Sequence, residues 1–85
     1  MKVVTTSDFE KQRARLPARV QRFCDIQLAH FTSNHRDPRL HIKKLTDVEG
    51  VYSFRITRNY RGLFYFDFEG NAVIFAIGDR KEIYR

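Results

Sequence analysis

Two neighbouring segments in the second half of the chain alternate between apolar and polar side chains, and this pattern constrains the fold most. In residues 51–57 the apolar positions are Tyr52, Phe54 and Ile56. In residues 61–68 one face carries Phe64, Phe66 and Phe68, and the other carries Arg61, Leu63, Tyr65 and Asp67. Successive side chains of a strand point to opposite faces of a sheet. The pattern therefore predicts two antiparallel strands with an aromatic face in the core, and it places Arg55 and Arg61 together on the other face.

The first half of the chain predicts a short strand followed by a helical hairpin. Residues 3–5 suit a strand, and Ser7 with Glu10 forms a capping box that starts a helix over residues 8–16. Pro17 suits the first turn of a second helix. The apolar stripe of that helix is Val20, Phe23, Cys24, Gln27, Leu28 and Phe31. Three arginines fall outside the stripe, which gives the hairpin an apolar side and a basic side.

The remaining segments predict turns, a link and one further strand. Loops and turns are expected at residues 32–39, 47–50 and 69–71. Residues 40–45 form a short link that is either helical or extended. Residues 72–77 are uniformly apolar, as in a central strand covered on both faces. Together the elements predict one α+β domain over residues 1–85, in which an N-terminal strand and a helical hairpin pack on a small antiparallel sheet.

The chain is strongly basic. Its formal net charge is +6, and residues 11–44 hold nine lysines and arginines against two acidic residues. Such a surface attracts phosphate-bearing partners. An ordinary solvated face, or a docking surface for an acidic protein, accounts for the same charge, so all three interpretations stay open at this point.

Other reactive residue types do not form a recognisable site in the sequence. The single cysteine, Cys24, excludes an internal disulfide and lies on the apolar helical stripe, which favours core packing. His30, His35 and His41 lack metal-ligand spacing, so we expect structural or solvated roles for them. No metal or other cofactor is expected. The absence of a bilayer-spanning apolar run and of a secretory signal predicts a cytoplasmic protein without membrane contact.

The last third of the chain resembles a known family. The segment GVYSFRITRNYR at residues 50–61, followed by IGDRKEIY at residues 77–84, resembles the RelE/ParE toxin superfamily of bacterial toxin–antitoxin modules. The combination of an Arg-Ile-Thr…Tyr-Arg strand pair with a terminal Gly-x-Arg…Tyr is fairly specific. The preceding strand and helical hairpin fit the RelE-like fold and its size.

The resemblance implies the function of the RelE-like branch, whose members are mRNA interferases that cut messenger RNA in the ribosomal decoding site. It implies a metal-independent endoribonuclease in which the 2′-hydroxyl of the RNA attacks the neighbouring phosphate, and translation is inhibited. The implied partners are messenger RNA, the 70S ribosome and a cognate antitoxin protein.

By position, the resemblance also implies a catalytic set that consists of Arg55, Arg61, Arg80 and Tyr84. The arginines stabilise charge on the phosphate, and Tyr84 orients the substrate or assists proton transfer. The implied RNA or ribosome contacts are Lys11, Arg13, Arg15, Arg19, Arg22, Lys43 and Lys44. Ser53 and Asp79 stand where the best-known branch has a second lysine and several relatives a histidine, so the sequence identifies no general base. The chain ends at Arg85, and no C-terminal helix is expected.

Two other functions are compatible with the same residues. One is a ParE-like toxin without nuclease activity that binds DNA gyrase, in which the arginines are contacts or solvated surface. The other is a catalytically weak relative that binds only RNA or an antitoxin-like partner. The joint presence of Arg61, Arg80 and Tyr84 favours the nuclease.

Overall fold

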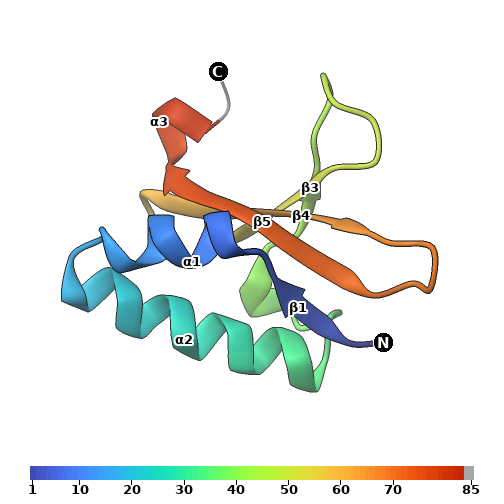
Figure 1. The fold of residues 1–85 in the computed structure, drawn as a ribbon, viewed down its shortest axis with the longest axis horizontal. Coiled ribbons are helices and arrows are strands. Elements are labelled where there is room, and N and C mark those ends of the chain that lie inside the picture. The colour runs from blue at the N-terminus through green and yellow to red at the C-terminus, as the bar shows by residue number, and fades with distance from the viewer. Residues whose placement is uncertain (84–85) are drawn as a thin grey trace.

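The computed structural model describes residues 1–83, which form a five-stranded sheet with two main helices (Figure 1). In chain order the elements are β1 (Val3–Thr5), α1 (Ser7–Ala14), α2 (Ala18–Ser33), the 3-10 helix η1 (Pro38–Leu40), β2 (Lys43–Lys44), β3 (Tyr52–Arg55), β4 (Tyr60–Phe66), β5 (Ala72–Asp79) and α3 (Arg80–Ile83). The strands lie in the order β1-β5-β4-β3-β2. Only β1 and β5 pair in parallel; the other neighbours are antiparallel. The predicted α+β architecture is confirmed.

The two faces of the sheet are covered very differently. Figure 1 shows α1 and α2 together on one side, whereas the β2–β3 loop and α3 rise from the other side. The helices lie on the face that carries the apolar side chains of β3, β4 and β5, because burial of those side chains stabilises the fold. The opposite face of the sheet is left open between the loop and α3.

Aromatic side chains between α2 and the sheet form the centre of the core. The ring of Phe31 meets the rings of Phe54 and Phe64 edge-on, with centroids 5.5 and 4.9 Å away. Phe54 lies opposite Gly62 in the register of β3 and β4, and a Cβ at Gly62 would overlap its ring. Because Gly62 has no side chain, the rings of Phe54, Phe31 and Phe64, which we call the aromatic layer, can pack against the backbone of β4. Burial of Phe54 and Ile56 confirms the inward face predicted for this strand.

The helices begin at slightly different residues from those predicted. The hydroxyl of Thr6 caps α1 by accepting a hydrogen bond from the backbone N–H of Phe9, a role that the sequence assigns to Ser7. Thr6 takes this role because its backbone is still extended, which is the geometry that an N-cap requires. Pro17 stands as the cap residue before α2 and not within its first turn.

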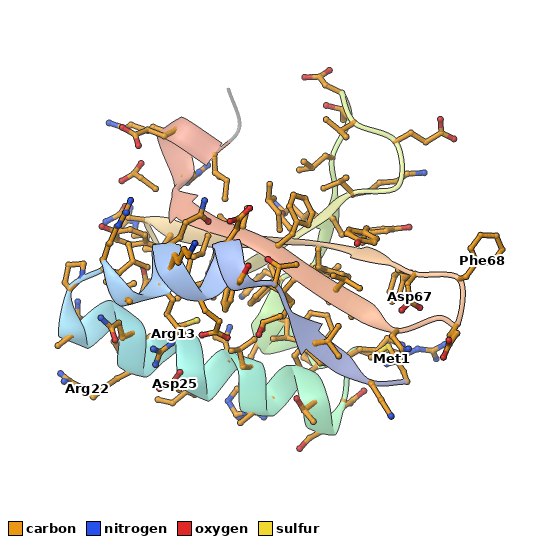
Figure 2. All side chains as sticks on the ribbon, in the orientation of Figure 1. Met1, Arg13, Arg22, Asp25, Asp67 and Phe68 are labelled. Carbon is orange, nitrogen blue, oxygen red and sulfur yellow. The ribbon has the colours of Figure 1, made fainter. Side chains whose placement is uncertain are left out.

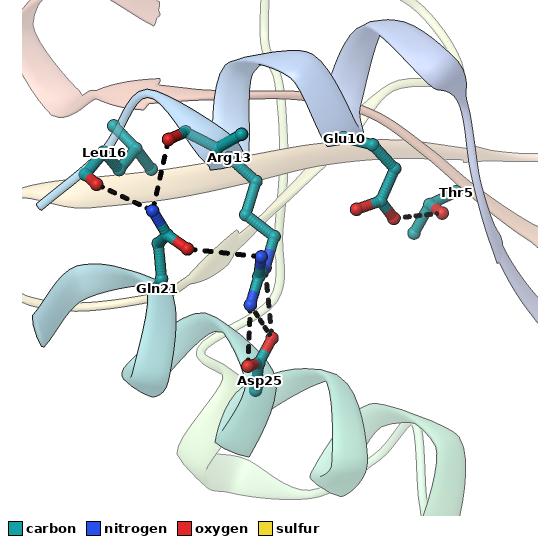
Figure 3. Close-up of polar contacts among 7 residues, drawn as sticks. Thr5, Glu10, Arg13, Leu16, Gln21 and Asp25 are labelled. Atoms are coloured by element: carbon teal, nitrogen blue, oxygen red, sulfur yellow. Dashed lines mark hydrogen bonds and ion pairs between the residues drawn. The ribbon is translucent and has the colours of Figure 1, made fainter. Parts of the chain in front are cut away.

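A network of polar contacts closes the helical hairpin (Figure 3). Nη2 of Arg13 in α1 contacts both carboxylate oxygens of Asp25 in α2, at 2.6 and 2.7 Å. Gln21 accepts a hydrogen bond from the same guanidinium and donates to the carbonyls of Ala14 and Leu16. The hydrogen bond to Asp25 raises the pKa of Arg13 above its ordinary value. This arginine therefore joins two helices.

The aromatic alternation of β4 ends earlier than predicted. The strand stops at Phe66, which is exposed, and Phe68 is fully exposed at the tip of the β4–β5 turn (Figure 2). The carboxylate of Asp67 accepts hydrogen bonds from the backbone N–H groups of Glu69 and Asn71, so the turn begins at this residue. These bonds, that from Asn71 above all, lower the pKa of Asp67. The ring of Phe66 still packs against those of Phe64 and Tyr52, with centroids 5.6 Å from each, so the predicted inward face ends after Phe66, where the chain reverses.

The sequence predicts that β5 is covered on both faces, but the structure fully covers only one of them. Ala72, Ile74 and Ile77 are buried in the core. Val73 and Phe75 are only half-buried on the other face. The outer face of β5 is partly covered by its neighbours: the ring of Phe75 lies against that of Tyr65, with centroids 5.7 Å apart. Apolar side chains on both faces of β5 are therefore at least partly shielded from water.

Candidate functional site

A cleft of about 380 Å³ lies on the open face of the sheet. Its ionisable lining consists of His41, Lys43, Lys44, Arg55, Arg61 and Arg80, with Asp47 in the β2–β3 loop. The cleft therefore brings together three members of the catalytic set that the sequence predicts. The fourth, Tyr84, lies outside the described residues.

Arg55 and Arg61 are directly opposite each other in the register of β3 and β4. The side chain of Arg61 is buried, at 8% exposure. Its Nη1 donates to the backbone carbonyls of Thr57, Arg58 and Tyr60, at 2.6, 3.1 and 3.0 Å. Arg61 therefore lines the cleft and also holds the β3–β4 turn in shape. The sequence does not indicate this second role.

Arg55 has a polar atom that the described part of the chain leaves unsatisfied. Its Nε is buried, and no hydrogen-bond partner for it exists among residues 1–83. A buried donor without an acceptor costs about 1–3 kcal/mol. This Nε has almost no accessible surface, but the planar guanidinium has further N–H donors that are suited to the oxygens of a phosphate.

His41 also lines the cleft, a position that no motif in the sequence indicates. Its Nε2 lies 3.4 Å from Nη1 of Arg55. Its backbone has φ 47° and ψ 50°, a left-handed conformation that is uncommon outside glycine. No local sequence motif indicates this contact, because Arg55 stands 14 positions after His41 in the chain.

Two sets of contacts fix η1, and with it His41, relative to β3. Nε2 of Gln27 in α2 donates to the carbonyl of Arg39 at 2.8 Å and to that of Arg55 at 2.7 Å. The carboxylate of Asp37 caps η1 by accepting from the N–H of Arg39 and pairs with its guanidinium at 2.7 Å. These bonds with Arg39, that to its guanidinium above all, lower the pKa of Asp37 to about 2.

Arg80 reaches the cleft from the other side, at the start of α3. The sequence predicts no helix here, but Arg80–Ile83 form a short one. The carboxylate of Asp79 accepts a hydrogen bond from the N–H of Lys81 at 2.8 Å, which supports this turn of helix. The N–H of Arg80 donates to the carbonyl of Asn59 at 2.6 Å, which ties α3 to the β3–β4 turn. The side chain of Arg80 is exposed.

Two of the predicted RNA contacts adjoin these arginines. The sequence predicts a link at residues 40–45 without deciding whether it is helical or extended. In the structure this link contains the strand β2, in which Lys43 pairs with Ser53 and Lys44 with Tyr52. Both lysines are exposed and line the cleft, and Ser53 is buried in its floor. This edge of the sheet therefore adds positive charge to the row of arginines.

The other five predicted RNA contacts lie on α1, on α2 or between them, on the opposite side of the sheet. Four of them are exposed and form what we call the helical basic surface: Lys11, Arg15, Arg19 and Arg22. Figure 2 shows Arg22 directed away from the sheet. Arg13 is occupied by Asp25, and Arg19 lies over the ring of Phe23, 5.1 Å from its centroid. The sheet separates this surface from the cleft, so the two are distinct.

Two other kinds of chemistry are not supported by the described residues. Cys24 is fully buried, and this burial raises the pKa of its thiol to about 11, which disfavours the reactive thiolate.

Among residues 1–83, no group of three or more His, Cys, Asp or Glu side chains is placed to hold a metal ion. Within the same range, no helix has the length and apolar composition needed to cross a membrane.

Comparison of the sequence with models of protein families and with curated proteins finds no match. Solved structures do match. A chain of the RelB–RelE antitoxin–toxin complex from Methanococcus jannaschii aligns with a TM-score of 0.78 at 18% identity, over 95% of this chain and 94% of that chain. The isolated RelE toxin of E. coli aligns with a TM-score of 0.69 at 18% identity, over 98% and 89%. The chain has the RelE-like toxin fold.

A further toxin–antitoxin complex also contains a chain of this fold. A chain of the RelBE2 toxin–antitoxin complex from Mycobacterium tuberculosis matches at 25% identity and a TM-score of 0.65, over 95% of this chain and 92% of that chain. Because these alignments cover nearly the whole of both chains, the RelE-like fold accounts for the entire domain. The resemblance to the RelE/ParE superfamily that the C-terminal motifs indicate is confirmed in the fold.

Proposed function

We propose that this chain is the toxin of a type II toxin–antitoxin module and that it cuts messenger RNA on the ribosome. The observation that carries the proposal is the meeting of Arg55, Arg61 and Arg80 in one cleft of a RelE-like fold. Solved proteins of the same fold come from antitoxin–toxin complexes, which supports a cognate antitoxin as a partner. The proposed site of action, the translating ribosome, is cytoplasmic.

The proposed reaction is attack by the 2′-hydroxyl of a ribose on the adjacent phosphate. The phosphate gains negative charge as the new bond forms, so positioned cations stabilise the transition state. Arg55 supplies guanidinium N–H donors, Arg61 stands opposite it across the strands, and Arg80 lines the same cleft from α3. Lys43 and Lys44 extend the positive field along the rim of the cleft. Tyr84 is proposed, from the resemblance alone, to orient the substrate.

We propose that cleavage depends on the ribosome because a free messenger is flexible and is not held with its 2′-hydroxyl in line with the phosphate. Holding a messenger in the reactive geometry contributes up to about 7–11 kcal/mol for well-oriented groups. We propose that the helical basic surface docks on ribosomal RNA, because it faces away from the cleft and cannot contact the same phosphate.

The proposal is tested with purified protein and one messenger, presented either free or in programmed ribosomes. We expect cleavage only in the ribosomes, with the cut sites mapped by primer extension, and arrest of growth and translation when the chain is expressed without its antitoxin. Equal cutting of the free messenger would contradict ribosome dependence. Inhibition of gyrase supercoiling by the same preparation, without RNA cleavage, would instead establish the ParE-like alternative.

A further inference from the structure

We propose that His41 is the general base that accepts the proton of the attacking 2′-hydroxyl; this inference rests on the proposed function. The cleft holds three arginines and two lysines, and none of these is suited to remove a proton near neutral pH. A reaction of this kind needs a proton acceptor within hydrogen-bond reach of the nucleophile. His41 supplies the imidazole among the side chains that line the cleft.

The contact between His41 and Arg55 defines which atom of the imidazole is available. Nη1 of Arg55 lies 3.4 Å from Nε2 of His41. A guanidinium has donors and no acceptor, so this contact is a hydrogen bond in the tautomer whose Nε2 carries the lone pair. The bond is long and is readily exchanged for a stronger one to a phosphate oxygen. A phosphate held by Arg55 then lies next to a free imidazole nitrogen.

The order of the groups fits an in-line displacement. His41 precedes the edge strand β2, Arg55 and Arg61 are paired on β3 and β4, and Arg80 follows β5. The proton acceptor therefore stands at one end of a row of cations. Attack from the side of His41 on a phosphate between Arg55 and Arg61 would place the leaving oxygen on the side of Arg80.

The backbone of His41 supports a functional role. Its φ of 47° is a conformation that non-glycine residues adopt rarely and that is concentrated at functional sites. The surroundings hold it there: its N–H donates to the carbonyl of Pro38, the preceding Leu40 is fully buried, and Gln27 bridges η1 to β3. The imidazole is therefore carried on a fixed support.

Asp47 in the β2–β3 loop is the competing acceptor, because it is a carboxylate in the lining of the cleft. It is exposed on a loop, and no hydrogen bond of its carboxylate to the described residues is found. Nε2 of His41 lies 3.4 Å from Nη1 of the arginine proposed to hold the phosphate, and no hydrogen bond between Asp47 and this arginine is found. The geometry therefore favours His41, and Asp47→Asn tests the competing assignment.

The step balances without any further reactant except water. The proton of the 2′-hydroxyl moves to Nε2 of His41, and the freed electron pair forms the bond from the 2′-oxygen to phosphorus. The bond from phosphorus to the 5′-oxygen breaks, and that oxygen takes the electron pair and a proton from water. The imidazolium returns its proton to the hydroxide that remains. The products are a 2′,3′-cyclic phosphate and a 5′-hydroxyl end.

The experiment measures single-turnover cleavage in programmed ribosomes at saturating protein. His41→Asn keeps a side chain that tolerates the left-handed backbone but cannot transfer the proton, and we expect a loss of about 10²- to 10⁴-fold. His41→Gly also suits the backbone, and added imidazole should restore a large part of its rate. His35→Asn, at an exposed histidine outside the cleft, should cleave within about threefold of wild type, since surface changes away from the reacting atoms have small effects. A loss in Asp47→Asn as large as that in His41→Asn would instead assign the proton transfer to Asp47 and overturn the proposal. Thermal unfolding confirms that each variant is folded.

A pH profile separates proton transfer from positioning. The wild-type rate should fall toward acid pH, because only the unprotonated imidazole accepts a proton, and the His41→Asn rate should not show this fall. His41→Gln retains an oxygen that can accept from Arg55, so wild-type cleavage by this variant would overturn the role as base in favour of positioning. Wild-type cleavage by His41→Asn would likewise overturn it. A wild-type protein that cuts no messenger would overturn the proposed function, and this inference with it.

Discussion

Gln27 donates a 2.7 Å hydrogen bond to the backbone carbonyl of Arg55 from the far side of the core. The same amide nitrogen donates to the carbonyl of Arg39, so one buried side chain of α2 connects η1 to β3. His41 directly follows η1, and Arg55 lies in β3. The helical layer therefore sets the geometry of a cleft that lies on the other face of the sheet.

Replacement of Gln27 by leucine should destabilise the protein and weaken cleavage together. The substitution leaves two carbonyls without their donor, and each unsatisfied buried polar group costs about 1–3 kcal/mol. Gln21→Leu on the same helix is the control, because its amide also donates to two carbonyls but far from the cleft. Urea unfolding and single-turnover cleavage are measured for both. Cleavage lost equally in the two variants, at matched stability, would contradict a specific role for Gln27.

Gly62→Ala should destabilise the fold by about 1–3 kcal/mol, as overpacking of a dense core does. A Cβ there overlaps the ring of Phe54, which is fully buried against Phe31 and has little room to move. Gly78→Ala is the control, since among the described residues a Cβ at Gly78 meets only Ile83 at 3.9 Å, an ordinary contact. Denaturant midpoints of the two variants provide the comparison. Similar midpoints would show that the aromatic layer adapts more freely than the packing indicates.

Alternation in the sequence was enough to predict the open face of the sheet. Arg55 and Arg61 have the opposite phase to Phe54 and Phe64, and a period of two allows only one arrangement of those faces. The prediction failed at Phe68, because the hydrogen bonds of Asp67 reverse the chain before that residue. A side chain that accepts from the backbone overrides a strand pattern locally, and the apolar sequence alone does not reveal where.

The cleft itself was only partly predictable. The sequence placed Arg80 near the site through the resemblance, but gave no sign of the helix that presents it. The position of His41 in the cleft was not indicated, because its partner is remote in sequence and its backbone conformation depends on η1 and Gln27. Arg13 was expected to contact RNA, yet Asp25 occupies it across the hairpin. Each of these outcomes depends on tertiary contacts, which no short pattern encodes.

Arg80→Ala and Arg61→Ala should both abolish most cleavage but differ in stability. Loss of one positioned cation at a developing charge costs about 3–4 kcal/mol of transition-state stabilisation, roughly a hundred- to a thousandfold in rate. Arg80 is exposed, so its loss should leave unfolding unchanged. Arg61 is buried and donates to three carbonyls, so its removal should also destabilise the β3–β4 turn. Cleavage rates and thermal midpoints of both variants are compared with wild type. Full activity in both would show that the cleft is not the reactive site.

The ion pair that caps η1 should make stability depend on pH at the acid end. The pKa of Asp37 is lowered in the folded state to about 2, from an ordinary 3.8, mainly by hydrogen bonds from the Arg39 guanidinium. The stabilisation is therefore present above pH 3.8 and is lost as the pH falls through 2. Asp37→Asn should be less stable than wild type at pH 6, and the gap should close near pH 2. A gap that stays constant across this range, measured by urea unfolding, would assign the effect to packing.

Charge reversal on the helical basic surface should weaken ribosome binding and leave the reaction of the bound complex unchanged. Arg15→Glu with Arg22→Glu is the preferred pair, because both side chains are exposed and Arg19 packs on Phe23. Each lost phosphate contact lowers the slope of log affinity against log salt by about one. We therefore expect a weaker and flatter salt dependence of ribosome binding, measured by sedimentation at several salt concentrations.

The control must separate a local surface from net charge. Lys2→Glu with Arg36→Glu changes the net charge by the same amount at exposed positions outside this surface and outside the cleft. If general attraction of a basic protein to RNA is the cause, the two double variants will bind the ribosome equally weakly. If docking through α1 and α2 is the cause, only Arg15→Glu with Arg22→Glu will lose affinity and salt slope. At saturating protein that variant should still cut at the wild-type rate, because the sheet keeps its altered side chains away from the phosphate in the cleft. A lower rate at saturation would show that the two surfaces act on the same step.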